Sequence, residues 1–304
     1  MLIHKEVLGK EHSLTAITYN NIADVYQDQG DYANALIYYR KAMVIKESTF
    51  GTEHPITAVT YGNIAGVYYK QNNYREALEW YLKDLSVNEK ILGLEHPDTA
   101  TTYNNISLIY EALNDYKQAI EFSKKALVIR KKVFGIEHPR TAAAYGNIAT
   151  IYNAQGDYSE ALTLHMKALG IYENSLGTEH PDTAMCYNNI AYIYQCTGDY
   201  TQALEWNYKA LAIREKILGS THPDTGTTYN NIACAYYSMK KFSEARDYFC
   251  RAVISMEVYK MTDTAKLNST VKSLFECYVI CGGEENKFGL WLAERDLTYT
   301  SWCD

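Results

Sequence analysis

The sequence is short of positive charge and of long apolar segments. Its 304 residues carry 29 Lys and Arg against 36 Asp and Glu, which gives a net charge of −7. Binding to nucleic-acid phosphates requires a basic face, so we expect no nucleic-acid partner. No apolar run approaches the roughly 18 residues of a membrane span, and no signal peptide is visible. We therefore expect a cytoplasmic chain that has no membrane partner.

Cysteine and proline are also scarce, with seven and five residues. The cysteines all lie between Cys186 and Cys303 and do not recur at a fixed spacing, so they do not form a disulfide framework. Reduced cytosolic thiols are the expected state. The five prolines share one setting, because each directly follows a histidine. This shared setting is part of a repeat.

Signatures of catalysis are missing as well. The chain contains neither a glycine-rich phosphate-binding loop nor a Gly-x-Ser-x-Gly nucleophile motif. Its aspartates and glutamates follow helix starts and solvated faces, so no acid–base pair stands out. The sequence predicts a protein that is not an enzyme and needs no cofactor.

The chain does contain a phrase that recurs every 42 residues. The sequence Tyr-x-Asn-Ile begins at Tyr19, Tyr61, Tyr103, Tyr145, Tyr187 and Tyr229. A histidine recurs in phase with it, at His12, His54, His96, His138, His180 and His222. Such a repeat is typical of a solenoid, in which each copy buries its apolar face against its neighbours.

Each copy contains two helical patterns, which we name its first and second helix. In the first copy, Tyr19, Ile22, Ala23 and Tyr26 occupy one helix face. The second helix starts near Tyr32, and the expected lengths are ~15 and ~18 residues. Between the two helices lie residues that mostly tolerate a left-handed backbone, namely Gly30, Asn72, Asn114, Gly156, Gly198 and Lys240. A small residue in each second helix lets the pair approach closely, at Ala35, Ala77, Ala119, Ala161, Ala203 and Ala245.

The histidine–proline phrase predicts the start of each first helix, because proline suits the first helical position. A zinc site is the alternative interpretation of the histidines. Zinc requires ligands within about 2–2.3 Å of one point, whereas stacked helices lie about 10 Å apart. We therefore expect no metal site.

The repeat resembles the tetratricopeptide repeat, through Tyr19, Ile22-Ala23, Tyr26, Ala35, Tyr39 and Ala42. Its 42 residues, rather than the usual 34, are similar to the long repeats of kinesin light chains. The resemblance implies an all-α fold, a right-handed superhelical α-solenoid of stacked antiparallel helix pairs. Residues 1–260 would form six such copies, the first preceded by a partial second helix at 1–10. Residues 261–304 would form a C-terminal capping helix and a short tail.

The two ends of the chain carry further expectations. Because residues 1–10 match the end of a second helix, the chain is either a fragment of a longer protein or starts with a half-copy as a cap. Val271, Leu274 and Tyr278 keep the repeat phase, and Gly282 occupies the turn position. This pattern predicts a capping helix, which solenoids need. Trp291 would lie on one more short helix, either packed as part of the cap or occupying a groove as an internal ligand.

The resemblance also implies that the first helices line a concave groove. The second asparagine of each first helix forms what we call the asparagine ladder: Asn21, Asn63, Asn105, Asn147, Asn189 and Asn231. An amide both donates and accepts, so the ladder could hold a peptide backbone; alternatively, it ties one copy to the next. The candidate groove residues are Asn20, Asn21, Asn63, Tyr69, Lys70, Asn104, Asn105, Asn147, Asn153, Asn188, Asn189, Tyr192, Asn230, Asn231 and Tyr237.

A few residues depart from the repeat. Gly62, Gly66 and Gly146 lie inside helices, where each costs ~1 kcal/mol relative to alanine, which suggests close approach by a ligand or by the adjacent helix. Asp84 takes a position that is alanine in the other copies. We expect it to be a tolerated substitution partnered by a nearby tyrosine hydroxyl. His165 and Asn207 replace Tyr39 at a packing position, and no functional meaning is expected there.

These features favour a non-catalytic scaffold that binds a protein partner, as an extended peptide or a helix, in the groove. One alternative is a sensor or autoregulatory region of a larger protein, for example one linked to a nucleotide hydrolase. Another is self-association through the ends of the solenoid.

Overall fold

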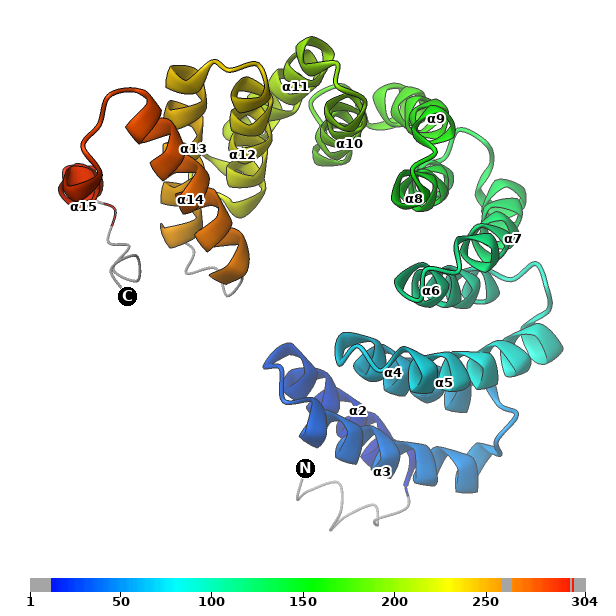
Figure 1. Ribbon diagram of the computed structural model, residues 1–304. Helices are drawn as coiled ribbons and strands as arrows, with labels where there is room; N and C mark the ends of the chain where they lie inside the picture. Colours follow the sequence, from blue (N-terminus) through cyan, green and yellow to red (C-terminus); the bar gives the residue numbers. More distant parts are fainter. Residues whose placement is uncertain (1–11, 259–263, 296, 298–304) are drawn as a thin grey trace. The chain divides into compact units, whose positions relative to one another are not determined.

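The computed structural model describes residues 12–258, 264–295 and 297, so the partial helix expected at 1–10 lies outside the described residues. The chain divides into an N-terminal unit, residues 1–157, and a C-terminal unit, residues 158–304. Every regular element in the described residues is helical (Figure 1). The expectation of an all-α fold of stacked helix pairs is confirmed.

The N-terminal unit holds seven α-helices and a π-helical segment among its described residues. These are α2 (Ser13–Asp28), α3 (Tyr32–Phe50), α4 (Pro55–Lys70), α5 (Tyr74–Val87), η1 (Asn88–Leu92), α6 (Pro97–Ala112), α7 (Tyr116–Phe134) and α8 (Pro139–Gln155). The C-terminal unit contains α9 (Tyr158–Leu176), α10 (Pro181–Thr197), α11 (Tyr200–Leu218), α12 (Pro223–Ser238), α13 (Phe242–Val258), α14 (Thr264–Ile280), η2 (Glu285–Lys287) and α15 (Phe288–Ala293). Within each unit, a first helix packs along the second helix of its own copy, as α4 does on α5 and α12 on α13.

The first helices all begin in the same way. A histidine occupies the N-cap, and its Nδ1 accepts a hydrogen bond from the backbone N–H two residues later. The proline that follows takes the first helical position, as expected. Histidine is not among the favoured N-cap residues, so its capping role was not evident from residue type. Among the described residues, no group of three or more His, Cys, Asp or Glu is placed to hold a metal ion.

The expected turns between the paired helices are confirmed. Gly30, Asn72, Asn114, Gly156, Gly198 and Lys240 all have positive φ, between 60° and 88°. Lysine rarely adopts this conformation, whereas glycine does so without cost. The observation at Lys240 means that the repeat geometry imposes the turn even where the residue disfavours it.

The core lies between the paired helices and between neighbouring copies. The small residues of the second helices, from Ala35 to Ala245, are fully buried. Tyr19, Tyr61 and Tyr103 are at least nine-tenths buried, and the Tyr61 and Tyr103 hydroxyls donate to glutamates of the preceding second helix. The tyrosines of the repeated phrase therefore join successive copies by both packing and hydrogen bonds.

In the C-terminal unit, α14 packs on α13 and buries Val271, Leu274 and Tyr278. Gly282 ends it with a φ of 92°. Trp291, on α15, stacks on Phe288 and contacts the ring of Tyr278. Trp291 thus packs on Tyr278 of α14.

No helix in the described part of the chain is both long and apolar enough to cross a membrane.

Candidate functional site

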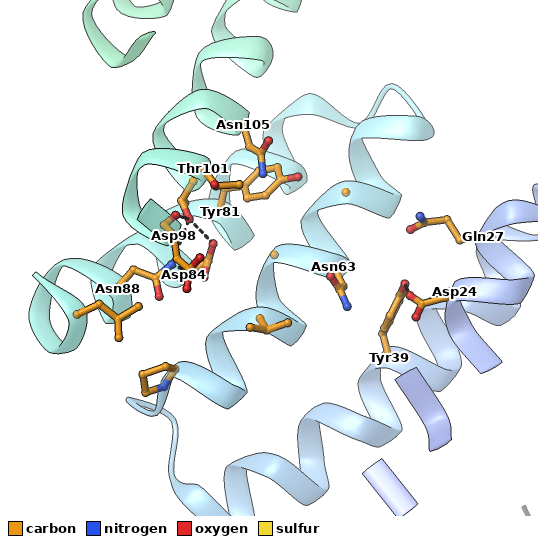
Figure 2. A pocket seen from close by; sticks show the side chains of 16 residues that line it. Asp24, Gln27, Tyr39, Asn63, Tyr81, Asp84, Asn88, Asp98, Thr101 and Asn105 are labelled. Atoms are coloured by element: carbon orange, nitrogen blue, oxygen red, sulfur yellow. Dashed lines mark hydrogen bonds between the residues drawn. The ribbon is translucent and has the colours of Figure 1, made fainter. Parts of the chain in front are cut away.

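The N-terminal unit contains a polar pocket of about 370 Å³, which we name the α4 pocket. Its walls come from the first helices α2, α4 and α6 and from the second helices next to them (Figure 2). The residues that line it are Asp24, Gln27, Tyr39, Pro55, Val59, Gly62, Asn63, Gly66, Tyr81, Asp84, Asn88, Leu92, Asp98, Thr101, Thr102 and Asn105. A volume of this size lies in the range of pockets that bury small ligands or a few side chains.

Two glycines of α4 face polar side chains of α5. A Cβ atom on Gly62 would lie 3.4 Å from Oδ2 of Asp84, and one on Gly66 would lie 3.6 Å from the Tyr81 hydroxyl. Both are ordinary van der Waals distances, so close approach by the adjacent helix does not by itself require either glycine. Gly146 differs, because a Cβ atom there would meet nothing within 4 Å.

Asp84 is 7% exposed and holds the centre of a small hydrogen-bond network. The Thr102 hydroxyl donates to its Oδ2 at 2.7 Å, and the Asn88 amide donates to its Oδ1 at 3.0 Å. The expectation of a tyrosine partner is wrong, since these two groups face the carboxylate instead. Burial raises the pKa of Asp84 to about 6, although both hydrogen bonds act to lower it.

Tyr81 points its hydroxyl into the α4 pocket from the side of α5 (Figure 2). Its side chain is only 8% exposed, and burial raises its pKa to about 12. Among the described residues, no partner hydrogen-bonds to this hydroxyl, whereas the hydroxyl of Tyr39 donates to Asp24, its neighbour on the same side of the pocket. The Tyr81 hydroxyl is therefore a hydrogen-bonding group that a ligand in the pocket could use.

The α4 pocket is acidic. Figure 2 shows Asp84 and Asp98 on one side of α4 and Asp24 on the other, with Asn63 between them. Among the described residues, no lysine, arginine or histidine lines the pocket. Its polar lining consists of carboxylates, amides and hydroxyls, all of which can accept hydrogen bonds.

The asparagine ladder forms a pair between copies at two junctions of the described residues. The amide of Asn147 donates to Oδ1 of Asn104, the first asparagine of the preceding copy, and Asn231 donates to Asn188 at 3.1 Å. Asn105 cannot do this because the preceding copy carries Gly62. The Asn105 amide lines the α4 pocket instead, without a side-chain hydrogen bond to the described residues. Ladder positions therefore tie copies together at some junctions, and Asn105 is left to face the pocket.

The other candidate residues lie in varied settings. Oδ1 of Asn20 and of Asn153 is buried without a hydrogen bond to the described residues. Asn21, Lys70 and Tyr192 are exposed, and Asn189 is half-buried. Tyr69 packs on Tyr74, with ring centroids 5.7 Å apart. Asn230 accepts from Thr270, and the Tyr237 hydroxyl donates to Glu276, so α14 takes up both of these side chains.

The groove prediction did not include Tyr81, Asn88 or Asp98. Tyr81 and Asn88 come from a second helix and its end, and Asp98 from a first turn, whereas the prediction considered only one stripe of the first helices. A signal was present, because Gly62 and Gly66 occur in the same copy as Asp84. Two side-chain deletions opposite one added carboxylate indicate a polar space.

Comparisons with known proteins agree with this architecture. A sequence profile of the tetratricopeptide repeat matches residues 1–48, 14–87, 59–132, 98–174, 140–216 and 182–253. No curated protein matches the chain. Among solved structures, the nearly identical TPR-like repeats of a kinesin light chain-like protein from Podosopora anserina share 25% identity, cover 67% of this chain and 97% of their own, and give a TM-score of 0.60.

Two further structures share the fold at lower identity. BtubC (BKLC) from P. vanneervenii is 19% identical, over 76% of this chain and 90% of its own, with a TM-score of 0.60. A signal transduction ATPase with numerous domains and a tetratricopeptide repeat sensor, from Pyrococcus horikoshii, is 17% identical. It covers 92% of this chain and 43% of its own, with a TM-score of 0.68. On the match along residues 1–253, the chain belongs to the tetratricopeptide repeat family.

Proposed function

We propose that the chain is a non-catalytic scaffold that binds an extended peptide, or a partner helix, on the face formed by its first helices. The observation that supports this most directly is the contrast within the asparagine ladder. Asn147 and Asn231 bind other asparagines, whereas Asn63 and Asn105 line the α4 pocket without side-chain hydrogen bonds to the described residues. A half-buried amide that can donate and accept suits the backbone of an extended peptide.

The test compares ladder positions that face the pocket with one that ties copies together. Short peptides selected from a random library on the intact chain are measured by fluorescence polarisation against the variant Asn63→Ala/Asn105→Ala. The matched control is Asn231→Ala, which removes an inter-copy pair in the other unit. We expect the double variant to lose binding by about tenfold or more, since each hydrogen bond contributes about 1 kcal/mol.

Circular dichroism checks that both variants keep their helix content. If a folded double variant binds the selected peptides as tightly as the unchanged chain does, the amides do not hold the ligand. The proposal would then be wrong for this face of the helices.

The alternative is a sensor region of a larger signalling protein. Its support is the similarity in fold to the sensor-bearing ATPase from Pyrococcus horikoshii, of whose chain the likeness spans 43%. Sequencing the gene on both sides of this region is the test. A phosphate-binding loop encoded in the same reading frame would favour the sensor, and a reading frame without one would count against it.

A further inference from the structure

The α4 pocket has a counterpart three copies further along the chain, in the C-terminal unit. The counterpart pocket measures about 200 Å³. Its Pro181, Leu218 and Asp224 occupy the repeat positions that Pro55, Leu92 and Asp98 occupy in the α4 pocket. The two pockets are thus the same place in the repeat, and an arginine lines the smaller one.

Arg214 is that arginine. One nitrogen of its guanidinium, Nη1, donates to the Thr228 hydroxyl at 2.7 Å and to the backbone oxygen of Asp224 at 2.8 Å. It also reaches Oδ1 of Asn188 at 3.5 Å. This position in the repeat therefore has the shape and the acceptors to hold a guanidinium group.

In the α4 pocket the arginine is replaced by Asn88. Three other copies carry a cation at this position: Lys46, Arg130 and Arg214. Lys46 donates to Thr60 at 2.8 Å, which is the same link that Arg214 makes to Thr228. In the copy with Asn88 the side-chain amide makes this link, donating to Thr102 at 3.1 Å, but it carries no charge.

The same copy also gains an acidic group. Asp84 stands where the Arg214 copy has Ala210, and Gly62 stands where it has Asn188. Compared with its counterpart, the α4 pocket has one cation fewer, one carboxylate more and a larger open volume. The hydroxyl of Tyr81, a residue that is 8% exposed, adds an unused hydrogen-bonding group on the same wall.

We infer that the α4 pocket binds the guanidinium group of an arginine side chain supplied by a peptide ligand. This inference rests on the proposed function and specifies what the peptide must contain. The ligand would provide from outside the group that Arg214 provides from within the chain. A guanidinium has five donors in a planar fork and makes strong hydrogen bonds to carboxylates. Asp98 and Tyr81 present acceptors for that fork on the side of α4 where Asp84 lies, and Asn105 can accept or hold the peptide backbone.

The affinity should depend on pH through Asp84. The titratable groups that face it are Tyr81 on its own helix and Asp98 on α6, and the α4 side presents Gly62. Asp24 and Tyr39 complete the titratable lining from α2 and α3. A bound cation favours the ionised carboxylate, and a group with a pKa of about 6 is mostly protonated at about pH 5. Binding should therefore tighten by up to about tenfold between about pH 5 and pH 7.5.

The probe is an acetylated and amidated pentapeptide with arginine between alanine pairs, titrated into the intact chain by calorimetry. A citrulline peptide, which has nearly the same shape without the charge, and a lysine peptide serve as comparisons. We expect the citrulline peptide to bind at least about tenfold more weakly, because hydrogen bonds to charged groups contribute more than neutral ones. The lysine peptide should rank between the two, because its ammonium lacks the planar fork.

Two substitutions test the location. Asn88→Arg restores the internal arginine, so it should fill the α4 pocket and abolish binding of the arginine peptide. Gly62→Ala should weaken binding by narrowing the pocket floor. Its matched control is Gly146→Ala, the equivalent glycine two copies later, around which there is open space. Thermal unfolding monitored by circular dichroism checks that each variant is folded.

Three results would overturn the inference: no binding of the arginine peptide at millimolar concentration, equal binding of the citrulline peptide, or full binding by a folded Asn88→Arg variant. If Asn88→Arg does not fold, the comparison of Gly62→Ala with Gly146→Ala decides the location. The proposed function is judged separately. Library peptides that depend on Asn63 and Asn105 but lack arginine would keep it and refute only the arginine pocket.

Discussion

Replacing Asp84 by asparagine should stabilise the N-terminal unit at neutral pH. The folded chain buries this carboxylate, which raises its pKa from 3.8 to about 6. Asparagine has nearly the same shape and no charge, and it can still accept from Asn88 while donating to the Thr102 hydroxyl. The substitution therefore removes the cost of burying a charge and keeps the hydrogen-bond network in place.

The magnitude follows from the pKa difference. One pKa unit corresponds to about 1.4 kcal/mol, so the change from 3.8 to about 6 amounts to about 3 kcal/mol. Because the folded pKa is raised, the protonated carboxyl contributes this stability fully below about pH 4 and loses it as the pH rises through about 6. At about pH 5 roughly half of it, about 1.4 kcal/mol, is present. Asp84→Asn should therefore gain up to about 3 kcal/mol at pH 7.5 and about half of that at pH 5.

Hydrogen exchange of the amides in α4, α5 and α6, followed by mass spectrometry, reports this local free energy of opening. Wild-type chain and Asp84→Asn are compared at both pH values, with exchange rates corrected for the intrinsic effect of pH. Asp28→Asn serves as a control at an exposed carboxylate of α2. If the difference between wild type and Asp84→Asn is the same at both pH values, Asp84 does not titrate near pH 6 and the reasoning is refuted.

Three further predictions concern other parts of the chain. Burial lowers the pKa of His165 to about 4, so the free energy of unfolding of the C-terminal unit should fall by up to about 3 kcal/mol between about pH 7 and pH 4. His165→Phe should remove this loss, measured by hydrogen exchange of α9, and an unchanged loss would contradict the prediction. Asn147→Ala should cost about 1 kcal/mol in urea unfolding because it breaks the bond to Asn104, while Asn105→Ala should cost clearly less; equal costs would contradict the paired ladder. Gly146→Ala should raise the free energy of unfolding in urea by about 1 kcal/mol, because alanine favours helix and its Cβ meets nothing within 4 Å. A lowered urea midpoint would mean that this space is needed.

The fold was predictable because it depends on period and residue size. Tyr19, Ile22, Ala23 and Tyr26 specify a helix face, and the left-handed turns were found at the expected residues, Lys240 included. These features are local, so a few residues of sequence are enough to recognise them. The same local features then recur in each of the six copies.

The site was only partly predictable, because it depends on which side chains meet across helices. The spacing of the ladder could not reveal that Asn147 bonds to Asn104 while Asn105 has no such partner, since the outcome depends on the residue in the copy before. The partner of Asp84 was misjudged for a similar reason. Both Thr102 and Asn88 are ordinary polar residues in the sequence, and only packing brings them to the carboxylate.

The paired asparagines also have a mechanical consequence. The junction between the α6 and α8 copies carries the tie from Asn147 to Asn104, while the junction between the α4 and α6 copies lacks it because of Gly62. The α4 pocket spans this untied junction. A ligand that bridges α4 and α6 would supply the missing tie, so that binding would stiffen the junction between these two copies.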